Sequence, residues 1–198
     1  SGLLERRDGG KKLFVSRPTV AAVGGGVSEA LSLHGARFAD VWEALRAMEP
    51  VIAAAAARRR TSAQLAGLAE VVADFAADDL PAGQAVECVG RFFRALGIAS
   101  GNPVFVIANE PLVQLVEPGL AIIIDRLPQA RRRIATAQRS IVEALARRDP
   151  ESAAEWMRRH IEDFRRGFEL AGLPLETVVG RQEGSDPALS PPRGQSGV

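Results

Sequence analysis

The sequence has a single cysteine, Cys88, among its 198 residues. One thiol cannot form a disulfide within the chain, so we expect a reducing, cytoplasmic setting. The net charge is also small, since 25 Lys and Arg residues against 24 Asp and Glu residues leave a formal charge of +1. No global field would draw such a chain to nucleic acid or to a membrane, and any DNA contact must come from a local patch.

Long apolar runs are missing as well. No apolar run opens the chain, so we expect no signal peptide. The most apolar stretch, PVFVIANEPLVQLVEPGLAIIID from Pro103, is interrupted by glutamates, a glutamine and two internal prolines. Such interruptions favour a buried, kinked helix over a membrane span.

Histidine is rare, with only His34 and His160 in the chain. Hydrolytic catalysis would need a nucleophile, a base and an orienting acid in one cleft. His34 stands at an expected helix end before a glycine, and no such set can be assembled around His160. We therefore expect that this protein is not an enzyme.

What the sequence does have is helical periodicity over residues 19–176, bounded by helix start and stop signals. Pro50 is expected to kink or divide the second helix. The pattern predicts an all-α fold, an antiparallel bundle of six or seven helices. The clearest starts are Thr61, Asn102 before Pro103 and Asp149 before Pro150, and the clearest ends are Gly35, Gly101 and Gly172.

The two ends of the chain differ from this middle region. Residues 1–18 carry short apolar arms around a basic Gly-Gly turn, the pattern of a short β-hairpin with charged shoulders. Residues 177–198 are rich in Gly, Pro and Ser, which predicts a disordered tail.

The order of these segments carries a family resemblance. A basic hairpin and a linker through Arg17 and Pro18 are followed by helical segments containing FADVWEALRAMEP, SGNP and ARRDPESAAEWMRRHIE. Up to about residue 172, this layout resembles the FadR-type GntR transcription regulators. In that family a winged helix-turn-helix reads DNA, and a helical C-terminal domain, the FCD domain, dimerises and binds a small-molecule effector.

The resemblance implies that residues 1–18 are the wing of the winged helix and residues 19–176 an FCD-like effector-binding domain of a homodimer. The helices that would precede the wing lie outside this sequence, so DNA would be contacted through a domain largely missing here. Wing cations can touch phosphate, although phosphate contacts carry no sequence information. The alternative, a solvated charged turn, is favoured for this fragment. The cations concerned are Arg6, Arg7, Lys11 and Lys12.

Many members of the family hold a divalent metal through an Asp and three His. The resemblance places these four positions at Val89, Phe93, Gln138 and His160. Periodicity independently puts all four on apolar helix faces that turn toward the core. A divalent ion needs several oxygen or nitrogen ligands, and Val and Phe supply none. We therefore expect no metal and no other cofactor, with Phe93 filling the volume of the ion.

Two interpretations of the remaining polar groups stay open. Gln138 and His160 either hydrogen-bond each other or a backbone carbonyl, or they orient an organic effector in an apolar cavity lined also by Val89 and Phe93. Arg46 sits where the family usually carries an arginine near the effector, and a guanidinium there could hold a carboxylate. Its alternative is an ion pair within the helix, with Glu43 or Glu49.

The favoured hypothesis is thus an effector-binding and dimerisation domain that senses a small organic acid or acyl-type ligand without a metal. One alternative is a purely structural dimerisation module with a filled core. Another is the helical ligand-binding domain of a different regulator class, the TetR type. A cavity at Phe93, Gln138 and His160 would favour the first hypothesis, and a solid core there the second.

Overall fold

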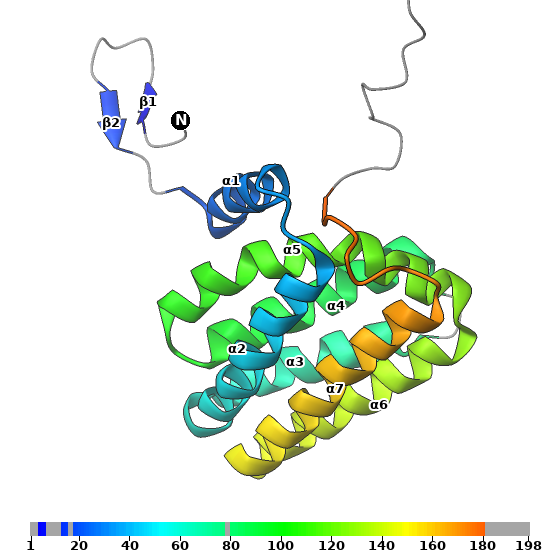
Figure 1. Ribbon diagram of the computed structural model, residues 1–198. Helices are drawn as coiled ribbons and strands as arrows, with labels where there is room; N and C mark the ends of the chain where they lie inside the picture. The colour runs from blue at the N-terminus through cyan, green and yellow to red at the C-terminus, as the bar shows by residue number, and fades with distance from the viewer. Residues whose placement is uncertain (1–3, 7–12, 16–17, 78–79, 181–198) are drawn as a thin grey trace, which may run out of the picture.

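The computed structural model describes residues 4–6, 13–15, 18–77 and 80–180. Within these residues the chain forms seven helices that pack as a bundle (Figure 1), which confirms the all-α prediction. The helices are α1 Val20–Leu33, α2 Phe38–Arg59, α3 Ser62–Phe75, α4 Ala82–Ala99, α5 Pro103–Arg126, α6 Pro128–Ala146 and α7 Pro150–Leu170.

The helix starts lie where the sequence placed them, because side chains there satisfy free backbone N–H groups. Thr61 and Gln64 form a reciprocal capping box at α3. Asn102 accepts a hydrogen bond from the backbone N–H of Val104 at 3.0 Å, and Asp149 accepts one from Ser152 at 3.0 Å.

Three of the helices are followed by a glycine, as the sequence predicted. Gly35, Gly101 and Gly172 take φ values of 73°, 67° and 75°, the left-handed conformation that glycine adopts without steric cost. Helix α3 ends at Phe75, without a glycine.

The internal prolines do not divide their helices. Helix α2 runs on through Pro50, and α5 through Pro111 and Pro118. All three lack a backbone N–H, but Pro50 and Pro111 are buried, and we attribute the continuity to the packing that holds these helices from several sides. Among the described residues α5 is also the one helix long and apolar enough to cross a membrane, and half of its apolar window is buried within the bundle.

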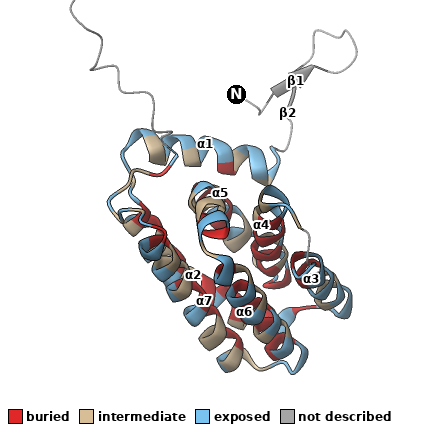
Figure 2. Ribbon diagram, turned by 90° about the vertical axis from the view of Figure 1, so that its right-hand side faces the viewer, coloured by how far each residue is buried: buried red, intermediate tan, exposed pale blue. Residues whose placement is uncertain are grey.

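The core lies between α2, α3, α4, α5, α6 and α7, whose buried faces turn toward one another (Figure 2). Helix α2 packs against α7 along its length and also contacts α4, α5 and α6. The ring of Phe38 at the start of α2 stacks on Phe168 of α7, with 3.5 Å between ring centroids. The largest completely buried side chains include Phe38, Phe92, Ile52, Leu68, Leu96, Ile141, Leu145, Met157 and Ile161.

The segment after α7 returns to the start of α2. The backbone N–H of Phe38 donates to the Thr177 carbonyl at 2.9 Å, and that of Ala39 donates to Leu175 at 3.0 Å. Val179 is buried and donates to Ala36. These contacts satisfy N–H groups of the first turn of α2, so the packed chain extends to Gly180 and the predicted tail boundary at residue 177 is too early. The rest of the predicted tail, 181–198, lies outside the described residues.

Near the N-terminus, strands β1 Leu4–Arg6 and β2 Leu13–Val15 pair antiparallel, with Leu4 opposite Val15. The turn between them, with Arg7, Lys11 and Lys12, lies outside the described residues. The hairpin and its assignment as a wing therefore stay predictions. Helix α1 follows and packs on α5.

Candidate functional site

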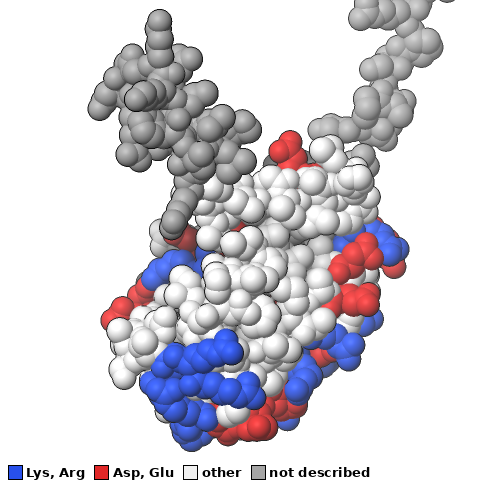
Figure 3. Space-filling model, turned by 90° about the vertical axis from the view of Figure 1, so that its left-hand side faces the viewer, with Lys and Arg blue, Asp and Glu red and all other residues white. Residues whose placement is uncertain are grey.

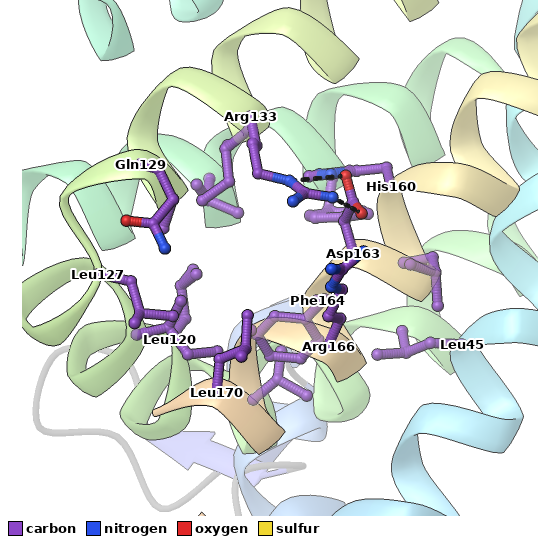
Figure 4. Close-up of a pocket in the computed structure, with 18 of the residues that line it drawn as sticks. Leu45, Leu120, Leu127, Gln129, Arg133, His160, Asp163, Phe164, Arg166 and Leu170 are labelled. Carbon is purple, nitrogen blue, oxygen red and sulfur yellow. Dashed lines mark hydrogen bonds and ion pairs between the residues drawn. The ribbon is translucent and has the colours of Figure 1, made fainter. Parts of the chain in front are cut away.

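Helices α4, α5, α6 and α7, together with Leu45 of α2, surround a cavity of about 70 Å³ that opens to the surface. Its wall is almost wholly apolar, and the main contributions come from α5 and α7. Figure 4 shows the labelled side chains around it. The apolar lining consists of Leu45, Val89, Phe93, Val113, Val116, Leu120, Ile123, Leu127, Ala130, Ile134, Ile161, Phe164, Gly167 and Leu170.

Three of the predicted site residues meet in this cavity. Val89 and Phe93 lie one turn apart on α4, and His160 faces them from α7. The His160 ring stacks nearly parallel on that of Phe93, with centroids 5.7 Å apart and planes at 5°. All three side chains are buried, so they form the closed inner end of the cavity.

The environment of His160 favours a neutral imidazole. Burial lowers the pKa of His160 to about 4, and the carboxylate of Asp163 opposes the shift only in part. A charged imidazolium at this depth would have to lose its water shell without an adequate partner. His160 therefore offers the cavity an uncharged ring.

Gln138 behaves differently from the other predicted residues. It is completely buried on α6, yet neither its amide nitrogen nor its amide oxygen has a hydrogen-bond partner, and it is not part of the cavity lining. The hydrogen bond to His160 or to a backbone carbonyl, one of the two interpretations left open by the sequence, is therefore not formed by Gln138. A buried unpartnered amide destabilises the fold, which makes this position unusual.

Arg46 lies away from this cavity. Its guanidinium pairs with Glu162 of α7 at 2.9 Å and lies over the Trp42 ring, 5.5 Å from the centroid. The pair crosses between helices, so neither Glu43 nor Glu49 is its partner as the sequence had suggested. Arg46 borders a separate depression with Trp42 and Arg165 and is not part of the lining of the apolar cavity.

The four family metal positions do not fit a metal here. Val89 and Phe93 have no ligand atoms, and the Phe93 ring stands against the His160 imidazole. No group of three His, Cys, Asp or Glu side chains that could hold an ion occurs within the part of the chain that the structure describes. Gln138 and His160 alone cannot replace the water shell of a divalent cation.

The sequence did not point to the polar groups at the mouth. Gln129 and Arg133 of α6 and Asp163 and Arg166 of α7 line the outer part of the cavity (Figure 4). Arg133 and Asp163 form an ion pair through two contacts, one of them 3.3 Å from Nε to Oδ2. The usable signal was spacing, because Asp163 follows His160 by three residues and so shares its helix face.

Comparison with known proteins agrees with this architecture. The FCD domain family profile matches residues 40–163, which is more than half of the chain. The fold is similar to the solved structure of Streptococcus agalactiae GntR, with 25% sequence identity, a TM-score of 0.57, and coverage of 83% of this chain and 75% of that one. No curated protein matches the sequence.

These similarities leave the TetR-type alternative without support and indicate a regulator rather than an enzyme. They also agree with the segments that first suggested the family, since SGNP, ARRDPESAAEWMRRHIE and all but the first two residues of FADVWEALRAMEP fall within the matched residues. The chain belongs to the FCD domain family of GntR-type transcription regulators.

Proposed function

We propose that this chain is the effector-binding and dimerisation domain of a GntR-type regulator, and that it senses a small organic acid or acyl-type molecule without a bound metal. The observation that carries the proposal is the apolar cavity whose inner end is formed by Val89, Phe93 and His160. Ligand sites are typically concave and apolar with a few polar groups, and this cavity has that composition. Its open space argues against the alternative of a filled structural core.

Effector binding would alter DNA affinity by changing the relative placement of two DNA-binding domains in a dimer. Those domains lie mostly outside this chain. Arg6, Arg7, Lys11 and Lys12 remain predicted phosphate contacts of the wing. A protein that acts on DNA in this way is expected in the cytoplasm.

A second copy of the chain is the proposed partner for dimerisation. Ile98, Val104 and Ile107, at the junction of α4 and α5, are 56%, 66% and 48% exposed. Figure 3 shows a broad uncharged area on one face of the bundle, bordered by charged side chains. Exposed apolar surface of this kind favours association. Sedimentation should give a dimer, and Val104→Glu should shift it toward monomer, whereas a monomeric wild type would contradict the proposal.

A thermal-shift screen tests the effector proposal. Organic acids and acyl compounds are expected to raise Tm, and zinc and nickel are not. Ala130→Phe, which places a ring into the cavity, should abolish the shift, because Ala130 is buried in its lining. Thr136→Phe puts the same ring on the exposed face of α6 and should leave it intact. Stabilisation by metal and by no organic compound would overturn the proposal.

A further inference from the structure

The cavity separates its polar groups from its apolar wall. Every charged lining residue belongs to the outer part, where Gln129, Arg133 and Arg166 are exposed and Asp163 is half-buried. The inner end holds hydrocarbon and the stacked pair of Phe93 and His160. A ligand that fits this distribution has one polar end and one apolar end.

The inner end is a poor place for a negative charge. Its only polar ring, His160, is neutral, since burial lowers its pKa to about 4. No cation occurs among the lining residues at that depth, and a carboxylate placed there would lose its hydration without compensation. The charged end of an acidic ligand therefore has to lie elsewhere.

The mouth supplies the missing positive charge. Arg133 and Arg166 contribute two guanidinium groups, against one carboxylate from Asp163. Asp163 engages Arg133, while no ion pair of Arg166 occurs within the described residues. The Arg133 and Asp163 side chains are 44% and 36% exposed, so this ion pair is solvated and can be exchanged for a ligand at small cost.

We propose that the effector is an amphipathic monocarboxylate whose hydrocarbon tail enters the cavity toward Phe93 and His160, and whose carboxylate binds Arg133 and Arg166 at the mouth. This inference rests on the proposed effector function of the same cavity. The orientation is opposite to metal-chelated binding, in which the carboxylate would lie innermost.

Two consequences separate this class from others. Affinity should rise about threefold to fourfold for each methylene added to the tail until the cavity is full, because each buried methylene adds a nearly constant binding free energy. A neutral molecule of the same length should bind more weakly, because it gains nothing from the guanidinium groups. Both effects are measurable with straight-chain compounds.

Isothermal titration calorimetry with hexanoate, octanoate, decanoate and 1-octanol provides the test. Octanoate is expected to bind at least tenfold tighter than 1-octanol. Arg133→Gln/Asp163→Asn, which removes the ion pair without leaving a lone carboxylate, and Arg166→Gln should each weaken octanoate at least fivefold and leave 1-octanol unchanged. Arg158→Gln, an exposed arginine elsewhere on α7, is the matched control and should change neither.

The outcomes distinguish the proposed ligand orientation from the effector-binding function on which it rests. Equal binding of acid and alcohol, or octanoate binding indifferent to both mouth variants, overturns the carboxylate orientation. So does a screen in which other organic compounds bind and no member of the acid series does. If Ala130→Phe still abolishes binding in those cases, the cavity keeps its proposed function. Binding that survives Ala130→Phe overturns both.

Discussion

Arg60 and Arg148 cross between the C-terminal ends of α2 and α6, each donating to backbone carbonyls at the other's helix end. Arg60 donates to the carbonyls of Leu145 at 3.1 Å and Ala146 at 3.0 Å. Arg148 donates to those of Arg58 at 3.0 Å and Arg60 at 3.3 Å. Both sets satisfy carbonyls that a helix end leaves free and place positive charge at the negative pole of the helix.

The first prediction concerns Arg60, whose side chain is buried. Arg60→Met keeps the aliphatic stem and removes the two hydrogen bonds, so it should lower the free energy of unfolding by about 2–4 kcal/mol. Guanidinium chloride denaturation measures this. Arg58 lies two residues before Arg60 and is exposed, so Arg58→Met should change the free energy of unfolding by less than about 0.5 kcal/mol. Equal losses for both variants would refute the crossed arrangement.

Helix α1 offers a matched pair of glycines. A Cβ added at Gly24 would lie 2.5 Å from Cγ of Glu110, a buried residue that pairs with Arg94 at 2.9 Å. Gly24→Ala should therefore loosen α1 from α5. Gly26→Ala meets nothing within 4 Å and should stabilise α1 by about 0.5–1 kcal/mol. Hydrogen exchange of the α1 amides should accelerate in the first variant and slow in the second; the same change in both would contradict this packing.

A third prediction follows from Glu49 of α2, which is completely buried with both carboxylate oxygens unpartnered. Burial raises the pKa of Glu49 to about 8, against a smaller opposite effect from the Asn109 amide. The protonated form is therefore favoured by folding. The stability that the protein gains from protonated Glu49 is fully present below the pKa of Glu49 in the unfolded chain. It is lost as pH rises from that value toward 8.

Glu49→Gln should remove this dependence. Between pH 5 and 8 the wild type should lose a few kcal/mol of unfolding free energy relative to the variant, as expected for a pKa displaced by several units. Urea denaturation at stepped pH measures the difference. Exposed Glu43→Gln serves as the control, and parallel pH profiles for wild type and Glu49→Gln would show that Glu49 is not held protonated.

The fourth prediction concerns the unpartnered amide of Gln138. Gln138→Leu removes two unsatisfied polar atoms at similar volume, so it should raise the free energy of unfolding by about 1–3 kcal/mol. Gln138→Glu has the same shape but introduces a buried charge and should destabilise at neutral pH. A loss of stability in Gln138→Leu, seen by thermal denaturation, would mean that the amide is satisfied in solution.

Local signals in the sequence predicted much of the fold. Thr61, Asn102 and Asp149 cap their helices through neighbours three residues away or fewer, so sequence spacing determines the contact. The apolar stripes likewise placed Val89, Phe93 and His160 in one interior. Contacts between helices could not be predicted this way, because Arg46 finds Glu162 only after α2 and α7 are packed.

The mouth of the cavity shows the same limit. Arg133 stands in a charged run that is typical of a solvated helix face, and only the packing of α6 on α7 brings it to Asp163. Gln138 illustrates the converse case. Its inward position followed from periodicity, but the missing hydrogen bond depends on side-chain geometry that no periodicity encodes.

A crystal structure of the chain grown with both decanoate and zinc tests the central claim most directly. The account predicts density for the acid, with its tail against Phe93 and His160 and its carboxylate at Arg133. Zinc bound by His160 and Gln138, with no acid in the cavity, would contradict it.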